Sequence, residues 1–284
     1  MRDNEFLIRN ITKDEVDSIA IEWAAKEGWN PGIYDADCFY SADPKGFFAG
    51  FLKDEAIACI SVVSYDSSFG FLGFYIVKPY YRGKGYGIEI WNKALAYLKT
   101  QNIGLDGVIE QQENYKKSGF SFAYNNIRYE GKAKLTSEFF PEIVNLSKVP
   151  FDDILHYDNG IFPVSRLNFL KCWIQQPESL SFAAIDKDKI VGYCVVRKCR
   201  NGYKYGPLFA NTAELANKLF TTANNYLIPE TKIFLDIPEK NKAALILAET
   251  HKMTKVFETA RMYTKSEPDI DINKVFGVTS FELG

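Results

Sequence analysis

The sequence is poor in the residues on which several common kinds of catalysis depend. Histidine occurs only twice among 284 residues, as His156 and His251, and neither lies in a recognisable motif. A histidine-based metal site or a Ser-His triad would have to depend on one of these two side chains. We therefore predict that the protein uses neither chemistry and holds no metal.

Cysteine is also scarce, and its spacing shows no motif. The five cysteines form no C-x-x-C pair, the arrangement that would indicate a zinc site or a redox centre. Buried, reduced thiols are the expected state, as is usual in cytoplasmic proteins. The positions are Cys38, Cys59, Cys172, Cys194 and Cys199.

The sequence has neither a long apolar run nor an excess of positive charge. No stretch of about 18 apolar residues is present to form a membrane-spanning helix, and the initial MRDNEFLIRN lacks the apolar core of a signal peptide. The formal net charge of −2 provides no overall field to attract nucleic acid or an anionic membrane. These absences predict a cytoplasmic protein without a nucleic-acid or membrane partner, and they leave its oligomeric state open.

Hydrophobic patterns predict an ordered series of elements in the first 131 residues. Thr12 and Glu15 have the spacing of a helix capping box, and Pro79 ends a strand. The predicted elements are a strand at 6–12, a helix at 13–28, a hairpin turning at 53–55, a strand at 69–79, a helix at 87–100, a strand at 103–109, a short helix at 111–119 and a closing strand at 121–131.

The second half of the chain repeats this order. FAGFLKDEAIACISVV, which begins at Phe48, resembles FAAIDKDKIVGYCVV, which begins at Phe182, and IGLD at 103–106 resembles IFLD at 233–236. KP at 78–79 likewise resembles GP at 206–207, and AYL at 96–98 resembles NYL at 225–227. In the order given, the four pairs are offset by 134, 130, 128 and 129 residues. Their shared order predicts two α/β domains of common ancestry, 1–131 and 143–284, joined by a linker at 132–142.

A glycine-rich loop separates the strand at 69–79 from the following helix. Gly83, Gly85 and Gly87 alternate within RGKGYG, 82–87. Glycines let backbone N–H groups approach a phosphate closely, and a helix N-terminus favours negative charge. The spacing matches neither a nucleotide P-loop nor a dinucleotide-binding fingerprint. The loop is therefore interpreted as a diphosphate site, with an ordinary glycine turn as the alternative.

This segment resembles the acetyl-CoA-binding loop of the GNAT superfamily of N-acetyltransferases. The pattern R-x-x-G-x-G fits 82–87, and NYKKSGF at 114–120 is similar to the family's Y-x-x-x-G-F segment. The repeated domain and the ending VFGVTSFELG resemble tandem GNAT proteins of the YitH type. The resemblance implies an α/β fold with two tandem GNAT-like domains, each a mixed, mostly antiparallel sheet flanked by helices.

The resemblance also assigns residues to acetyl-CoA. It implies that the pyrophosphate lies on the loop and helix start, and that the pantetheine arm pairs with the preceding strand. The family's asparagine seven positions before the tyrosine is here Val108, and Asn114 or Gln112 is the suggested replacement. The implied cofactor-binding residues are Tyr75, Ile76, Val77, Arg82, Gly83, Lys84, Gly85, Tyr86, Gly87, Ile88 and Asn114.

Three residues are the predicted catalytic groups. Tyr115 is implied, by resemblance, as the proton donor to the departing thiolate, and a packed core tyrosine is the alternative. Asp106 and Glu110 are the two candidates for the base that deprotonates the acceptor amine, although water could also carry that proton. A backbone amide of 75–77 is the expected oxyanion donor.

The C-terminal copy is predicted not to bind the cofactor. It keeps Asp236 and Asn241 at the family spacing, but Ala248 replaces the tyrosine, and GPLFANTAELANKLF has no glycine after Gly206. We therefore expect acetyl-CoA in the N-terminal domain only. The other copy would shape the acceptor site or stabilise the pair, since clefts between domains favour ligand sites.

The acceptor is less well defined by the sequence. Trp29 and Tyr34 are the predicted substrate-binding residues, with Asp35 or Asp37 available to attract a cationic amine; a solvated loop is the alternative. Glu282 is an acid in an apolar C-terminal stretch, placed either at the cleft or as a cap. The predicted function is acetyl transfer from acetyl-CoA to a primary amine of a small molecule or protein. The alternative is a non-catalytic acyl-CoA-binding or sensing module.

Overall fold

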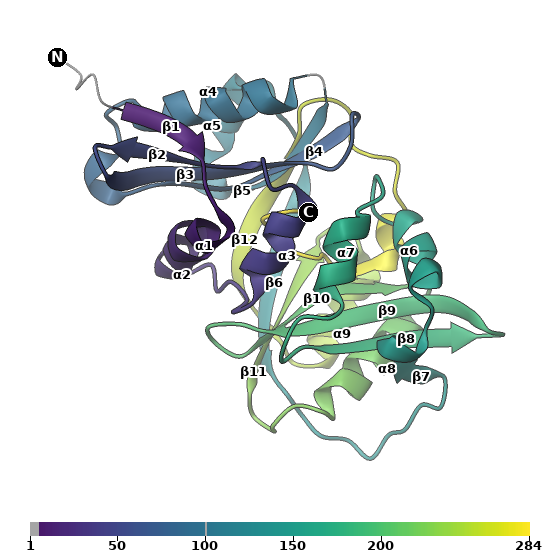
Figure 1. Ribbon diagram of the computed structural model, residues 1–284. Helices are drawn as coiled ribbons and strands as arrows, with labels where there is room; N and C mark the ends of the chain where they lie inside the picture. The colour runs from purple at the N-terminus through teal and green to yellow at the C-terminus, as the bar shows by residue number, and fades with distance from the viewer. Residues whose placement is uncertain (1–5, 100) are drawn as a thin grey trace.

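The computed structural model describes residues 6–99 and 101–284 (Figure 1). Residues 1–5 of the predicted N-terminal domain, and Thr100, the predicted end of the helix after the glycine loop, lie outside the described residues. Within these ranges, none of the helices is long and apolar enough to cross a membrane.

The N-terminal half contributes five strands side by side in the order β1-β2-β3-β4-β5. Strands β1 to β4 pair with one another antiparallel, and β5 runs parallel to β4. The hairpin predicted at 53–55 is confirmed, and Lys53 in its turn has a left-handed φ of 54°. The strands are β1 (Phe6–Asn10), β2 (Phe47–Leu52), β3 (Glu55–Ser64), β4 (Phe69–Val77) and β5 (Asn102–Val108).

The helices predicted in this half are also present. The capping box forms: the Thr12 backbone N–H donates to Glu15 Oε2 at 2.9 Å, and the Glu15 N–H donates to Thr12 Oγ1 at 3.4 Å. A π-helical stretch, Val16–Ile21, joins the first two helices into one run. The α-helices are α1 (Lys13–Glu15), α2 (Glu22–Lys26), α3 (Asp35–Ala42), α4 (Tyr86–Leu98) and α5 (Gln112–Lys117).

The C-terminal half repeats this arrangement, as the matched segments predict. Its strands β8, β9 and β10 are antiparallel, and β11 runs parallel to β10. The strands are β7 (Ile143–Asn145), β8 (Leu180–Asp186), β9 (Lys189–Lys198), β10 (Tyr203–Ala210), β11 (Lys232–Pro238), β12 (Thr254–Tyr263) and β13 (Val275–Gly277). The helices are α6 (Phe151–Asn159), α7 (Leu167–Trp173), α8 (Ala213–Asn224) and α9 (Lys242–Thr250).

The last long strand of each half is inserted into the other half. β6 (Ser121–Lys132) lies between β12 and β11, and β12 lies between β5 and β6. The expectation that residues 121–131 close the sheet of the N-terminal domain is therefore corrected, because β12 separates β6 from β5. The two halves share one continuous sheet rather than having two separate ones.

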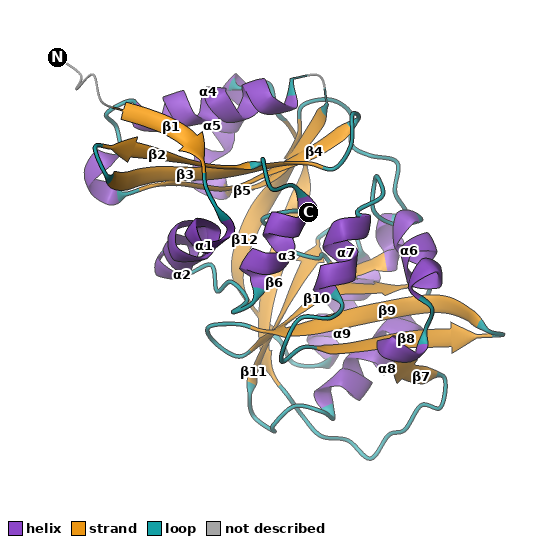
Figure 2. Ribbon diagram, viewed as in Figure 1, coloured by secondary structure: helices purple, strands orange, loops and turns teal. Residues whose placement is uncertain are grey.

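Helices cover this sheet in three groups (Figure 2). α4 packs on the N-terminal strands, and α8 and α9 pack on the C-terminal strands. Helices α1–α3, α6 and α7 lie between the two halves. In this middle layer the rings of Phe39 (α3), Phe74 (β4), Phe169 and Trp173 (both α7) are buried, with Phe39 in contact with the other three.

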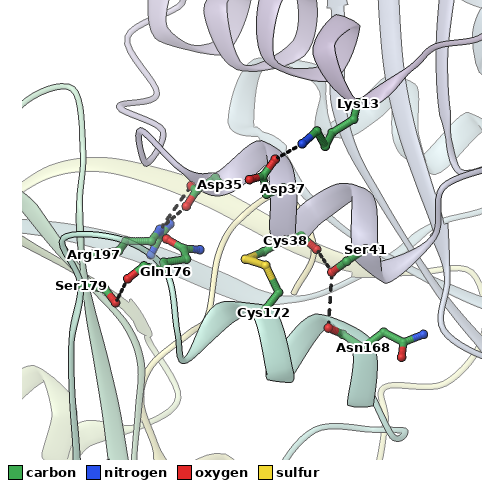
Figure 3. Close-up of a disulfide and its surroundings, with 10 residues drawn as sticks. All are labelled: Lys13, Asp35, Asp37, Cys38, Ser41, Asn168, Cys172, Gln176, Ser179 and Arg197. Atoms are coloured by element: carbon green, nitrogen blue, oxygen red, sulfur yellow. Dashed lines mark hydrogen bonds and ion pairs between the residues drawn. A yellow bond between two sulfur atoms is a disulfide. The ribbon is translucent and has the colours of Figure 1, made fainter.

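The prediction that all cysteines are reduced was wrong. Cys38 of α3 and Cys172 of α7 form a disulfide between the two halves, with their Cα atoms 5.2 Å apart (Figure 3). Cys59, Cys194 and Cys199 are buried free thiols. The pairing depends on the packing of α3 against α7, which local spacing does not reveal. Disulfides are rare in cytosolic proteins, so this one gives the cytoplasmic prediction no support.

Candidate active site

Strands β4 and β5 separate after their first four residue pairs. Their pairing ends at Leu72 and Leu105 in the described chain. On its other side β4 carries an irregularity opposite Cys59–Ser61, where Phe74 has a φ of 48°. Beyond Leu72 the edge of β4 that faces the gap therefore has no partner strand among the residues that the structure describes. A cavity of about 750 Å³ occupies this gap and reaches the glycine loop at one end.

The glycine loop forms the start of α4 as the sequence predicts. Gly83 and Gly85 have φ values of 73° and 94°, which side chains rarely adopt, and Gly85 precedes the first helical residue. A Cβ on Gly83 would meet open space, whereas one on Gly87 would lie 2.5 Å from Tyr75 Oη. No side chain of residues 6–99 or 101–284 caps α4, so its first-turn N–H groups remain available to an anion.

Most of the predicted site residues line the cavity. Tyr34, Lys84, Tyr86 and Asn114 are not among the lining residues. The predicted residues in its wall are Trp29, Tyr75, Ile76, Val77, Arg82, Gly83, Gly85, Gly87, Ile88, Asp106, Glu110 and Tyr115.

The four remaining predicted residues make other contacts. Tyr34 Oη donates to Glu178 Oε1 at 3.0 Å, and Asn114 Nδ2 donates to Gln111 Oε1 at 2.7 Å. The Tyr86 ring lies 4.8 Å from that of Phe6, and Lys84 Nζ lies 3.8 Å from the Tyr80 ring. Tyr34 therefore contacts the C-terminal half instead of the cavity, and Lys84 and Tyr86 belong to the glycine loop without lining the cavity.

Tyr115 is buried against the cavity wall. Its ring stacks on Trp91 at 5.6 Å, and a Cβ on Gly107 would lie 2.1 Å from it, so Gly107 leaves the space that the ring occupies. Burial, with smaller contributions from Tyr75 and Glu110, raises the pKa of Tyr115 above its ordinary value. The phenol is therefore protonated over the working pH range and can donate a proton.

The two predicted base candidates differ in their surroundings. Both Asp106 carboxylate oxygens are engaged, by Arg261 Nε at 2.8 Å and Nη2 at 2.7 Å, and Asn126 Nδ2 also donates to Oδ1. This ion pair joins β5 to β12 and disfavours Asp106 as a base. Glu110 is exposed, lies in the short 3-10 helix Ile109–Gln111 after β5, and also lines the cavity.

The equivalent gap in the C-terminal half is filled by protein. β10 and β11 pair in parallel only at Tyr203–Tyr205, and β13 adds to β10 beyond that point. Asn241 Nδ2 donates to the carbonyl of Val275 at 2.9 Å, and the Val278 N–H donates to the carbonyl of Asp236 at 2.8 Å. The two residues that keep the family spacing therefore hold the tail in place.

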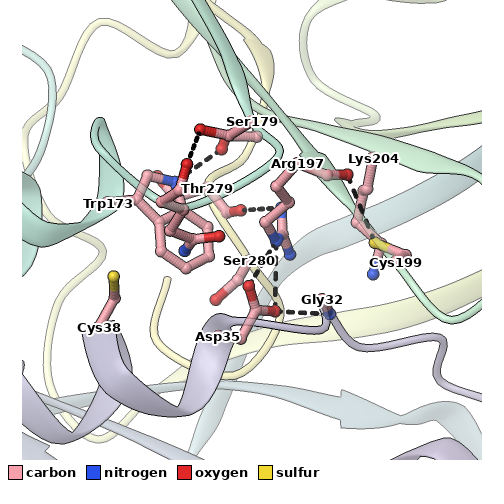
Figure 4. A network of polar contacts seen from close by, with 12 residues as sticks. Gly32, Asp35, Cys38, Trp173, Ser179, Arg197, Cys199, Lys204, Thr279 and Ser280 are labelled. Carbon is pink, nitrogen blue, oxygen red and sulfur yellow. Dashed lines mark hydrogen bonds and ion pairs between the residues drawn. The ribbon is translucent and has the colours of Figure 1, made fainter.

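After β13 the tail crosses to the N-terminal half. The carbonyl of Thr279 accepts from Arg197, which also pairs with the buried Asp35 (Figure 4). Phe281 and Glu282 then line the cavity, together with Phe257 and Thr259 of β12. From the sequence, Glu282 is noticeable only as a single acid in an apolar C-terminal stretch. No other feature of the sequence predicts that the tail and β12 form this wall of the cavity.

Comparisons with known proteins match both halves. Residues 13–120 match the model of the acetyltransferase (GNAT) family, and residues 154–277 match that of an acetyltransferase (GNAT) domain. The chain is 32% identical over 266 residues to holothin acyltransferase of Pseudoalteromonas sp. (strain SANK 73390), covering 94% of this chain and 90% of that protein. The chain belongs to the GNAT acetyltransferase family.

Solved structures show the same fold. A putative acetyltransferase of Pyrococcus horikoshii matches with a TM-score of 0.84 and 23% identity, covering 100% of this GNAT chain and 98% of that chain. A tandem GNAT protein from the clavulanic acid biosynthesis pathway matches with a TM-score of 0.66 and 9% identity, covering 93% and 100%. The predicted fold class, two tandem GNAT domains, is confirmed.

Proposed function

We propose that this protein is an acetyl-CoA-dependent N-acetyltransferase that binds its cofactor in the N-terminal half only. The observation that carries the proposal is the contrast between the two halves. The gap between β4 and β5 is an open cavity that joins a glycine loop to Tyr115, while β13 fills the gap between β10 and β11. That the protein is of the YitH type and that it is cytoplasmic both remain predictions from the sequence.

The residues present fit acetyl-CoA. The positive φ angles of Gly83 and Gly85 and the open space above Gly83 leave a cradle for the pyrophosphate at the uncapped start of α4. Residues 73–77 of β4 do not pair with β5 in the described chain, and this edge offers backbone groups to the pantetheine arm, although the Val77 carbonyl already accepts from Arg82 Nε at 2.8 Å. Arg82 adds a positive charge in the wall, although it also pairs with Glu27 at 2.5 Å. Acetyl-CoA supplies an activated acetyl group as a thioester.

The chain's own groups serve the transfer. A β4 backbone N–H can donate to the thioester oxygen as negative charge develops there. Tyr115 can give its proton to the departing sulfur. The acceptor must react as a neutral amine, since an alkylamine with a pKa of about 10.4 is mostly protonated at neutral pH. As the neutral amine adds to the thioester, its nitrogen must lose a further proton, so the site needs a group that accepts it.

The acceptor is proposed to be a primary amine on a small molecule or protein. Trp29, Phe257 and Phe281 give its end of the cavity apolar, aromatic walls, which suit a flat or apolar amine. The 32% identical relative is named for acylation of holothin, so holothin is the first acceptor to test. A panel of primary alkyl and aryl amines follows it.

Calorimetric titration of acetyl-CoA tests the cofactor site. We expect one molecule bound per chain by the wild type and none by Gly83→Glu, which places a carboxylate in the cradle. Gly119→Glu is the matched control, because Gly119 also has a positive φ, 91°, and open space around it, but lies after α5. Two sites per chain, or unchanged binding by Gly83→Glu, would contradict the proposal.

Turnover decides between the enzyme and a non-catalytic acyl-CoA sensor. Release of free CoA is measured with holothin and with the amine panel, using acetyl-CoA alone as the blank. An enzyme releases CoA only when an acceptor is present. Binding of acetyl-CoA without transfer to any amine would favour the sensor.

A further inference from the structure

Glu282 is a buried carboxyl group in the wall of the cavity that the described part of the structure leaves without a partner. Its residue is 4% exposed and lines the cavity beside Phe281. Within residues 6–99 and 101–284 its carboxyl group has no hydrogen bond or ion pair. Buried carboxyl groups are normally paired, so the group calls for a ligand or a role.

Each of the nearby cations has another partner, although Arg197 Nη2 makes no hydrogen bond within the described residues. Arg128 pairs with Asp236 at 2.7 Å, and Arg197 pairs with Asp35 at 2.9 Å. Lys204 Nζ donates to the carbonyl of Asn30 at 2.9 Å. Glu282 faces these charges at longer range. A counter-charge for Lys204 is the structural alternative, which the experiment below separates from a catalytic role.

The backbone on which Glu282 stands is held firmly in position. A Cβ on Gly73 of β4 would lie 2.2 Å from the Glu282 carbonyl oxygen, so the tail rests directly on the backbone of the strand that borders the cofactor site. Beyond it, Tyr65 Oη donates to the carbonyl of Leu283 at 2.7 Å, and the Leu283 N–H donates to Ser280 Oγ at 3.1 Å. Groups fixed in this way can act without reorganising.

A second polar group in the same wall also lacks a partner. Thr259 Oγ1 is buried, lines the cavity and makes no hydrogen bond within the described residues. Thr259 pairs with Val108 across β12 and β5, on the side of the gap opposite β4. An acceptor between the two strands would therefore meet a free hydroxyl and a free carboxyl group among aromatic side chains.

We propose that Glu282, delivered by the C-terminal tail, is the base that accepts the proton of the acceptor amine. This inference rests on the proposed function. The amine reacts in its neutral form, after its ammonium form has released one proton to solvent. As its nitrogen forms the bond to the thioester carbonyl carbon, the nitrogen loses a second proton to the Glu282 carboxylate and the C–S bond breaks. Tyr115 protonates the sulfur to give free CoA, and both side chains then exchange protons with solvent.

Glu282 suits this role better than the two bases predicted from the sequence. Asp106 has both oxygens bound by Arg261, and Glu110 is exposed to solvent. Burial raises the pKa of Glu282 above its ordinary value, while Lys204, Arg197 and Arg128 oppose the shift and Asp35 adds to it. Transfer should therefore decline as the pH falls through this raised pKa, because the protonated acid cannot accept a proton.

The test compares Glu282→Gln with the wild type, using the acceptor identified among holothin and the amine panel. We expect kcat to fall about 100-fold, the acidic limb of the kcat/KM profile to disappear, and the calorimetric affinity for acetyl-CoA to stay unchanged. Glu282→Asp should restore part of kcat. Glu267→Gln, at an exposed acid paired with Lys240, is the control and should behave as the wild type.

The outcomes separate this inference from the function on which it rests. If the wild type transfers acetyl to no amine, the proposed function and the role of Glu282 fall together. If the wild type turns over and Glu282→Gln keeps its kcat and its acidic limb, only the role of Glu282 is overturned. A variant that loses stability but keeps the acidic limb would show that Glu282 is a counter-charge.

Discussion

At the scale of single residues, Tyr115 offers a direct test of the chemistry. Tyr115→Phe keeps the ring that stacks on Trp91 and fills the space beside Gly107, but removes the proton donor. We expect kcat to fall about 100-fold with acetyl-CoA affinity unchanged, measured by CoA release and by calorimetry. Tyr226→Phe, at an exposed tyrosine, is the control. Full turnover by Tyr115→Phe would return Tyr115 to a packing role.

Asp106 tests whether an acid in the cavity wall is catalytic or structural. Its carboxylate is buried against Arg261, so Asp106→Asn leaves that cation unpaired and should lower the free energy of unfolding by about 3–5 kcal/mol. Asp236→Asn is the matched comparison, since Asp236 makes the equivalent buried pair with Arg128. Urea denaturation measures both. A stable Asp106→Asn protein with no turnover would instead make Asp106 the base.

Local spacing was enough to place single residues of the loop and the cavity wall, while their roles stay predictions. The positive φ of Gly83 and Gly85 and the place of Tyr115 in the cavity wall agree with what the loop and the Y-x-x-x-G-F segment indicate. Asp106 looked free because its partner, Arg261, is 155 residues away. A long-range ion pair leaves no mark in the spacing around either residue.

At the scale of elements, the disulfide between α3 and α7 should be a large contribution to stability. It closes a separation of 134 residues, and cross-links of long segments restrict the unfolded chain. We expect Cys38→Ser with Cys172→Ser to lower the free energy of unfolding by about 2–4 kcal/mol. Reductant should destabilise the wild type by a similar amount and leave the double variant unaffected. Equal stability of the two proteins would show that the cross-link is energetically neutral.

Most strands and helices followed from hydrophobic periodicity, but the tail did not. The hairpin β2–β3 and the helix α4 have clear local patterns, whereas β13 and residues 278–284 acquire their positions only from β10 and β4. For the disulfide, by contrast, the sequence did hold one signal. Cys38 and Cys172 are separated by 134 residues, the same offset as between the repeated segments that begin at Phe48 and Phe182. Equivalent positions of two repeats can meet across the axis that relates them.

At the scale of the whole molecule, duplication was readable from the sequence, but the exchange of β6 and β12 was not. Each strand has the same alternation of side chains wherever it pairs, so periodicity cannot say which half it joins.

The exchange of strands also explains two of the buried ion pairs between the halves. Asp106 of the first half meets Arg261 of the second, and Asp236 of the second meets Arg128 of the first, as expected of two related halves that swap their last strands.

This exchange makes the two halves one cooperative unit. Among the strands that the structure describes, β5 gains its second neighbour only from β12, and β6 pairs only with strands of the other half, so neither half can complete its sheet alone. Phe220 is fully buried in the C-terminal core, so Phe220→Ala leaves a large cavity there. It should lower the free energy of unfolding by about 3–5 kcal/mol. Hydrogen exchange should show this loss equally in peptides of β3 and of β9. If β3 kept its wild-type protection while β9 lost it, the halves would unfold independently despite the shared sheet.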